Sequence, residues 1–455
     1  MKRRHFLQRT SAGFVATLGG PGVWSCAARE PTERSYDFRP YRPGQLAAEA
    51  MCITPDDGFY VHTYYDICPY SASGRYLAVT RLPYQRQKPR WGDLAEVCVI
   101  DLVMQTITTV YQTRAWSYQL GANLQWAGER DRYLWTNDLI DGLPVCVRID
   151  LHTYQAHAFS GAKYDIAPSG KFCVSPNLLT MNTHQYGYAV PDPLRGTPGR
   201  FTKADMEHEG LWITDLVEDR VRLLAGFDQF ARQMADPDFY RDGLFYCFHS
   251  KINRPSNRIM QVLRWQLDGK GRNPSLFTLT PGGDEIVQCL SRKAWMRADR
   301  LGQAGNHPNW HPDGEHIIMN CVPEGAGEDQ LRFCAFRYDG SGFRVLSETH
   351  LGSGHPTVDP AWQFLLTDDY SEKSRQEHRG EIPIRLIGLS DDTETILCTV
   401  PNDVGGGGKT YLDADKKYGG SQHKLDAHPA WSRDYKQICF NGAPQGRRQV
   451  FVLTL

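Results

Sequence analysis

The apolar and polar residues beyond residue 50 follow the pattern of a β protein. Short apolar runs alternate with turns rich in Gly, Pro, Asn and Asp, and no stretch keeps the period of an amphipathic helix. The sequence therefore predicts many short strands joined by tight turns.

These strands fall into seven repeats. Strand-turn-strand units occur at 65–77, 123–135 and 164–172, and four more begin at His249, His307, His355 and His428. A second series of alternating strands follows these units, at 96–110, 144–159, 210–224, 261–279, 332–346, 383–400 and 448–455. An open sandwich with extra hairpins does not account for two series of seven. The repeats predict an all-β fold, a seven-bladed β-propeller.

The seventh repeat indicates how the ring closes. It reaches Leu455 without the outer strand that should follow it. A closed propeller takes such a strand from the other end of the chain, here from residues 36–60, so that no sheet edge stays open. We therefore expect one propeller domain over residues 36–455, preceded by an export signal and tether over residues 1–35.

The first residues predict export. Arg3 and Arg4 are followed by Phe6 and Leu7 and by a mild apolar stretch that is too short and glycine-rich to span a membrane. This pattern resembles a twin-arginine signal, with a disordered basic tail as the alternative. Cys26 lies in a loosely lipoprotein-like context. We expect an exported protein, periplasmic or at the cell surface, with no transmembrane span and with Cys26 as a candidate lipid anchor.

Charge and cysteine usage exclude some classes of protein. With 51 Lys and Arg against 52 Asp and Glu, the net charge of -1 gives no global field for binding nucleic acid. None of the 12 cysteines forms a C-x-x-C pair, and most lie in apolar runs. We expect them to be buried small hydrophobes and not a disulfide framework or zinc cluster.

A histidine recurs at one place in the last three repeats. The phrases NHPNW (306–310), GHPTV (354–358) and AHPAW (427–431) each precede a turn and an apolar run. Equivalent positions of a circular repeat converge at one mouth of the channel, and alignment places Asn123 and His249 there too. One such histidine is more often a turn cap, but three in register, with His423 and Asp426 just before His428, favour a metal or acid-base site.

Other candidate residues lie in loops and neighbouring strands. A Gly/Pro-rich insertion interleaves aromatic and cationic residues, among them Tyr188 and Arg200, which suits sugar stacking and carboxylate pairing or is simply a solvated loop. Arg264 follows His249 on a predicted strand. His62 precedes the first repeat and is either a packed strand histidine or a residue of one channel mouth.

The second half of the chain resembles oligogalacturonate lyase, a propeller family that cleaves oligouronides by β-elimination with a divalent metal, typically manganese. The likeness is carried by the terminal unit, 428–451, and by the turn HPNWHPDG at 307–314. It implies His307 as catalytic base and, less securely, Arg264 as the essential arginine. It also implies a metal site, whose ligands by position are His355, His423, Asp426 and His428.

The chain departs from this family at two of the ligands. His423 and Asp426 stand where the family has a glutamine and a histidine, so the metal, manganese with zinc or calcium as alternatives, is left open. The N-terminal half is more similar to propeller ulvan lyases and related rhamnose-glucuronate-cleaving enzymes. There the resemblance implies catalytic Tyr188 and substrate-binding Arg200, and Asn123 stands where some relatives carry histidine.

These patterns together predict a lyase that acts on an acidic, uronate-containing oligo- or polysaccharide. His307, Arg264 and Tyr188 would be catalytic, and Asn123, His249, Arg200 and His62 would bind substrate. Two alternatives stay open: a glycoside hydrolase of the rhamnosidase type acting on rhamnose-glucuronate linkages, and a propeller that binds glycans without chemistry.

Overall fold

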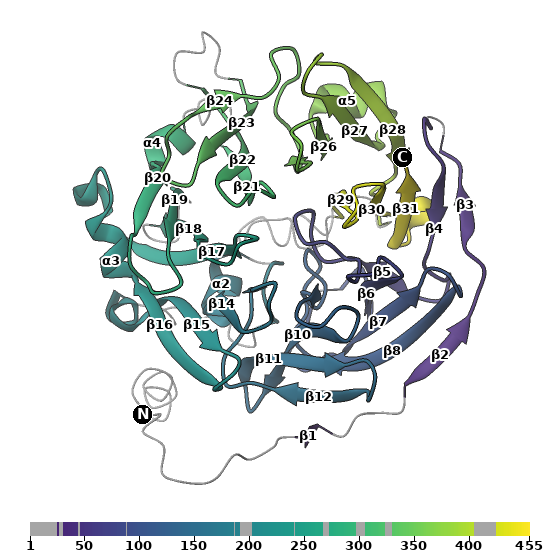
Figure 1. The fold of residues 1–455 in the computed structure, drawn as a ribbon, viewed down its shortest axis with the longest axis horizontal. Coiled ribbons are helices and arrows are strands. Elements are labelled where there is room, and N and C mark those ends of the chain that lie inside the picture. The colour runs from purple at the N-terminus through teal and green to yellow at the C-terminus, as the bar shows by residue number, and fades with distance from the viewer. Residues whose placement is uncertain are drawn as a thin grey trace.

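Seven small antiparallel sheets are arranged radially around a central channel (Figure 1). This computed structural model describes residues 25–26, 31–43, 46–87, 89–185, 187–191, 203–240, 242–266, 273–296, 305–323, 330–404 and 425–455. The sequence-based prediction of a seven-bladed β-propeller is confirmed.

The first four blades each contain four strands in chain order from the channel outward. They are β5 (Phe59–Val61), β6 (Tyr76–Leu82), β7 (Ala95–Asp101) and β8 (Thr106–Thr113) in blade one; β9 (Gln125–Trp126), β10 (Tyr133–Ile140), β11 (Leu143–Asp150) and β12 (Gln155–Ala158) in blade two; β13 (Asp165–Ile166), β14 (Phe172–Pro176), β15 (Gly210–Asp215) and β16 (Arg220–Gly226) in blade three; and β17 (Leu244–Ile252), β18 (Ile259–Gln266), β19 (Ser275–Leu279) and β20 (Val287–Leu290) in blade four.

The remaining blades complete the ring. They are β21 (Asn306–Trp310), β22 (His316–Cys321), β23 (Arg332–Arg337) and β24 (Arg344–Val345) in blade five; β25 (Thr357–Val358), β26 (Phe364–Asp368), β27 (Ile382–Gly388) and β28 (Glu394–Val400) in blade six; and β29 (Ala430–Trp431), β30 (Gln437–Gly442) and β31 (Gln449–Thr454) in blade seven.

Blade seven is closed by the N-terminal part of the chain, as the sequence predicts. Strand β4 (Ala50–Cys52) pairs antiparallel with β31, with Met51 opposite Val452, and β3 (Arg39–Tyr41) pairs with β4 in turn. Both strands lie in the 36–60 region. The two ends of the propeller are thus joined by backbone hydrogen bonds, and β31 has no open edge.

The segment before residue 36 also adds strands to the ring. Strand β1 (Ser25–Cys26) pairs with β12 of blade two, and β2 (Thr32–Ser35) pairs with β8 of blade one. In Figure 1 these two strands lie at the outer edges of their blades. Residues 1–24 lie outside the described residues.

Short helices occur only between strands of the described chain. They are α2 (Leu178–His184), α3 (Phe227–Arg232), α4 (Arg292–Trp295) and α5 (Glu372–Glu377), with 3-10 turns η1 (Lys203–His208), η2 (Pro237–Tyr240) and η5 (Pro444–Gly446). Within the described residues, no helix has the length and apolar character needed to cross a membrane.

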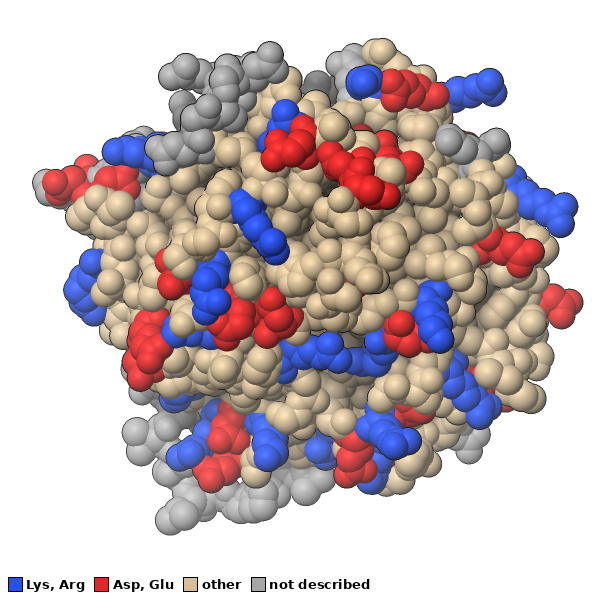
Figure 2. Space-filling model, turned by 45° about the horizontal axis from the view of Figure 1, so that its top comes forward, with Lys and Arg blue, Asp and Glu red and all other residues tan. Residues whose placement is uncertain are grey.

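The hydrophobic core lies between adjacent sheets, where alternate strand residues of neighbouring blades pack together. Of the eleven cysteines whose side chains are described, all are free thiols, and all but Cys68 are buried. They behave as the predicted small hydrophobes. Positive and negative side chains are interspersed over the face shown in Figure 2, with no continuous field of one sign.

Candidate functional site

The recurring histidines sit on kinks in the inner strands. His249, His307 and His428 have φ values of 55°, 56° and 47°, and Asn123 has 50°. Such values are rare for residues other than glycine, and in blades four and five they coincide with a register shift between the first two strands. One strained backbone position is therefore repeated in four blades, and it turns the side chain away from the regular strand direction.

The structure brings three of these imidazoles together with that of His355. The ring centroids of His307 and His355 are 4.0 Å apart, and those of His355 and His428 are 4.5 Å apart. His249 is linked to the group through Tyr64, whose ring centroid lies 5.5 Å from that of His249 and 4.5 Å from that of His428. The ring geometry thus gathers side chains that are separated by up to 179 positions in the sequence (428 minus 249).

Three of the predicted metal ligands form a compact donor set. The ligand atoms of His355, Asp426 and His428 all lie within 4.8 Å of one another, and all three residues are buried. Neither ring nitrogen of His428 has a hydrogen-bond partner among the described residues. Burying an imidazole whose nitrogens have no partner costs free energy, and a bound cation would be a partner for one of them. Imidazole and carboxylate donors suit manganese, zinc or iron, so these residues fit a divalent metal.

A second carboxylate, Asp368, organises this donor set. Its Oδ1 accepts hydrogen bonds from the backbone N–H of His355 at 2.8 Å and from Nδ1 of the same residue at 2.9 Å. Its Oδ2 accepts from the backbone N–H of His428 at 3.2 Å and from the hydroxyl of Tyr370 at 3.0 Å. With Nδ1 of His355 bound in this way, Nε2 is the nitrogen that can face a cation, as in carboxylate-histidine-metal arrangements.

His307 is held differently from the other histidines. Its Nδ1 lies 2.5 Å from the carbonyl oxygen of Gly354, which can only accept, so Nδ1 carries the proton and Nε2 has the lone pair. Burial and the neighbouring His355 hold the pKa of His307 well below its usual range. Unlike His249, His355 and His428, His307 keeps part of its surface exposed. A neutral imidazole with one accessible acceptor nitrogen is suited to take up a proton.

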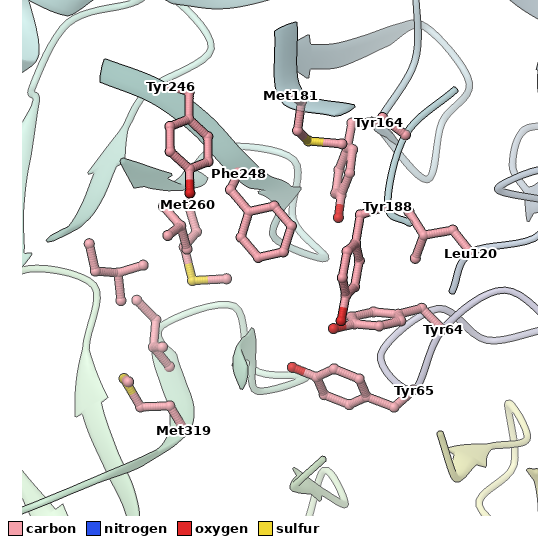
Figure 3. Packing of buried hydrophobic residues seen from close by; sticks show 14 of the residues in the cluster. Tyr64, Tyr65, Leu120, Tyr164, Met181, Tyr188, Tyr246, Phe248, Met260 and Met319 are labelled. Carbon is pink, nitrogen blue, oxygen red and sulfur yellow. The ribbon is translucent and has the colours of Figure 1, made fainter. Parts of the chain in front are cut away.

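A detour in blade one fills the centre of the channel. After β5, residues 62–66 leave the sheet and form a turn that is closed by the hydrogen bond from the N–H of Ile67 to the carbonyl of Tyr64, at 3.1 Å. The turn reaches blade four, where Lys251 forms an ion pair with Asp66. Figure 3 shows the rings of Tyr64 and Tyr65 pointing inward beside Tyr164 and Tyr188.

The remaining predicted residues are partly at this site. The Tyr188 ring lies 6.4 Å from that of Tyr64 and 5.9 Å from that of His249. Arg264 stacks on Phe248, with its guanidinium carbon 4.1 Å from the ring centroid, and donates to Gln185 at 2.5 Å. Both thus border the histidine cluster from blades three and four.

His62 and Asn123 are packed into the ring wall. His62 is fully buried with its ring centroid 6.5 Å from that of His428, and burial lowers its pKa to about 4. The Asn123 side chain donates to the carbonyl of Tyr164 at 2.9 Å and so links blade two to blade three. His249 shares a 2.6 Å hydrogen bond with the Tyr164 hydroxyl. The predicted residues Arg200 and His423 lie outside the described residues.

Comparisons with solved structures agree with this architecture. An oligogalacturonate lyase in complex with manganese matches 93% of this chain and 97% of its own, with a TM-score of 0.63 and 13% identity. An oligogalacturonate lyase from Vibrio parahaemolyticus matches 94% of this chain and 98% of its own, with a TM-score of 0.64 and 10% identity. The chain shares the fold of these lyases.

At the level of sequence, no family model and no curated protein matches the chain. The likeness to the two lyases therefore establishes the seven-bladed fold, and the chemistry has to be argued from the site itself.

Some site residues were missed by the sequence reasoning. Asp368 ends the second strand of blade six, and Lys251 follows His249 by two residues, but neither belongs to the repeated phrase. Tyr65 begins the first predicted repeat and Tyr64 directly precedes it, and neither position carries a local signal of a functional site. An Asp-Asp pair that closes an apolar run, as at 368–369, is the one local signal that was available.

Proposed function

We propose that this protein is a lyase that cleaves a uronate-containing glycan by β-elimination. The observation that supports this most strongly is the pairing of His307, neutral and partly exposed, with the His355, Asp426 and His428 donor set of blades six and seven. β-Elimination needs a base for the proton next to a carboxylate and a positive group that neutralises that carboxylate. The site supplies residues for both tasks.

His307 is the proposed base. Its Nδ1–H is engaged by the Gly354 carbonyl, so Nε2 can accept the C5 proton of the uronate and become part of an imidazolium. The nearby carboxylates of Asp368 and Asp426 favour that charged form. General base catalysis of this kind contributes about 10²- to 10⁴-fold to a rate.

His355, Asp426 and His428 would hold a divalent cation, for which manganese is our first assignment and zinc or calcium the alternatives. When bound, such an ion would neutralise the uronate carboxylate and make the adjacent C–H more acidic. Asp368 keeps His355 oriented by accepting from its Nδ1, and it also ties the backbone of blade seven to blade six through His428.

Arg264 and Tyr188 are assigned to the opposite side of the sugar. The Arg264 guanidinium stacks on Phe248 and would pair with a carboxylate or a ring hydroxyl. Tyr188 stands between Tyr64, Phe248 and His249 and is our candidate for returning a proton to the departing oxygen. Both assignments depend on the same substrate orientation, with C5 facing His307.

The test is a screen of the purified, metal-analysed protein against polygalacturonate, ulvan and rhamnose-capped glucuronan. We expect at least one of them to give the ultraviolet absorbance of an unsaturated uronate, and we expect His307→Gln to abolish it. Release of free rhamnose without unsaturation would identify the hydrolase instead. Binding that survives both chelation and His307→Gln, without any product, would identify a glycan-binding propeller.

We also propose that the protein acts after export. The support is the Arg3-Arg4 pattern, which lies outside the described residues. Replacing both arginines by lysine should leave the protein in the cytoplasmic fraction, and Cys26→Ala should release it from membranes if the thiol carries a lipid. The export proposal would be refuted if the wild type and the double variant Arg3→Lys, Arg4→Lys were found in the same proportions in the cytoplasmic and exported fractions.

A further inference from the structure

The backbone around His307 is held by side chains from two other blades, blade one and the adjacent blade four. The hydroxyl of Tyr65, in the blade-one turn, donates to the carbonyl oxygen of His307 at 2.8 Å. The ammonium of Lys251, in blade four, donates to the carbonyl oxygen of the next residue, Pro308, at 2.8 Å. Two successive carbonyls of blade five are thus fixed by donors from two other blades.

These two donors form one unit. Lys251 forms an ion pair with Asp66, the residue that follows Tyr65, and its Nζ lies 5.1 Å from the centroid of the Tyr65 ring. The indole N–H of Trp310 donates back to the Lys251 carbonyl at 3.0 Å. Because Lys251 is buried, its charge is compensated inside the protein and its position is strongly restricted.

The backbone that Tyr65 and Lys251 hold is strained at His307. His307 has a φ of 56°, a left-handed conformation that costs a histidine energy and persists only where surrounding contacts enforce it. The same conformation aims the imidazole at the channel, where its Nδ1 meets Gly354. Without the donors from Tyr65 and Lys251, the 307–308 peptide would relax toward a regular strand conformation, and the His307 imidazole would move away from the channel.

We infer that Tyr65 and Lys251 are positioning residues that hold His307 in its left-handed, channel-facing conformation. The effect on kcat rests on the proposed function, whereas the effect on the conformation of His307 does not. Neither residue is assigned to contact substrate or metal. Their effect is exerted through the His307 and Pro308 carbonyls.

The kinetic test compares Tyr65→Phe with Tyr70→Phe. Tyr70 is a fully buried tyrosine of the same blade whose hydroxyl has no hydrogen-bond partner among the described residues, so its removal is the matched control. We expect Tyr65→Phe to lower kcat by about 10- to 100-fold, since small misplacements of a catalytic group have effects of this size. KM and metal affinity should be unchanged, and Tyr70→Phe should leave kcat unchanged.

Two further variants separate positioning from general destabilisation. Combined with His307→Gln, the Tyr65→Phe substitution should cause no additional loss, because the group that it positions is gone. Lys251→Met should resemble Tyr65→Phe, and Lys251→Arg, which keeps the charge opposite Asp66, should recover part of the activity. An unchanged kcat in Tyr65→Phe, or a full additional loss in the double variant, would overturn the inference.

A spectroscopic measurement makes the result independent of the proposed reaction. The imidazole nitrogen signals of His307 can be assigned by their disappearance in His307→Gln. In Tyr65→Phe they should shift and lose the pattern of a single Nδ1–H tautomer, whereas in Tyr70→Phe they should stay in place. If no uronate is cleaved, the proposed function fails and this comparison still decides the positioning role. Unshifted His307 signals in Tyr65→Phe would refute it.

Discussion

Asp368 offers the sharpest test of the metal centre, because it touches two proposed ligands and is not itself assigned as one. Its carboxylate accepts from the ring and backbone of His355, from the backbone of His428 and from Tyr370. Asp368→Asn retains the shape but replaces one acceptor oxygen with an NH₂ group. Whichever way the amide is turned, a donor then faces an N–H group of His355 or His428.

The expected loss of metal affinity follows from this contact list. Removing a group that orients a metal ligand typically weakens binding about 10- to 100-fold, or ~1.4 to 2.8 kcal/mol. With metal at about 100 times the wild-type Kd, binding stabilises the wild-type fold by ~2.7 kcal/mol, whereas a variant with about 30-fold weaker affinity gains only ~0.9 kcal/mol. A buried N–H left without an acceptor costs a further ~1 to 3 kcal/mol in the metal-free protein.

The assay is calorimetric titration of the metal-free protein with Mn²⁺, with thermal unfolding followed in parallel. The matched control is Asp359→Asn, in the same blade, whose carboxylate accepts three backbone N–H groups of the next turn, those of Ala361, Gln363 and Phe364. Both variants should be destabilised, but only Asp368→Asn should bind Mn²⁺ more weakly. Wild-type Mn²⁺ affinity in Asp368→Asn would refute the idea that this carboxylate organises a metal site.

Three further outcomes are expected. His307→Gln should lower kcat about 10²- to 10⁴-fold, measured by product absorbance, with Mn²⁺ affinity within error of wild type. Burial lowers the pKa of His62 from 6.5 to about 4, so between these pH values His62 stays neutral in the folded protein and is protonated in the unfolded chain. Lowering the pH through this range should therefore reduce the free energy of unfolding by up to ~3 kcal/mol. Unfolding measured as a function of pH should show a smaller loss for His62→Phe. A chain beginning at residue 54 lacks β4 and should unfold at a much lower temperature than one beginning at residue 37; equal unfolding temperatures would show that the N-terminal closure is dispensable.

The features that depend on the repeat were predictable from the sequence. Turn formers at regular spacing between apolar runs predicted the number of blades, and the incomplete last repeat predicted a closing strand within residues 36–60, where β4 lies. Register alone placed His249, His307 and His428 around one channel, because a ring of equivalent units brings equivalent positions together. These predictions needed no knowledge of any single contact.

Features that break the repeat were not predictable in this way. The detour at residues 62–66 adds a turn to blade one, and only the folded ring shows that Tyr64 and Tyr65 lie among histidines of blades four, six and seven. Asp368 occupies an ordinary strand end in the sequence. Its importance comes from three-dimensional proximity to two loops, which local patterns do not encode.

Blade six shows how a departure from the repeat separates roles that look identical in the sequence. In blades five and seven the left-handed residue is the histidine, whereas in blade six it is Gly354, with a φ of 70°, one position earlier. A Cβ at Gly354 would overlap both the backbone carbonyl and the carboxylate of Asp368, so only glycine permits this approach. The shift lets His355 face Asp368 and turns the Gly354 carbonyl toward His307. One backbone offset therefore orients a proposed ligand and fixes the tautomer of the proposed base, which is why Gly354→Ala should impair both metal binding and proton transfer.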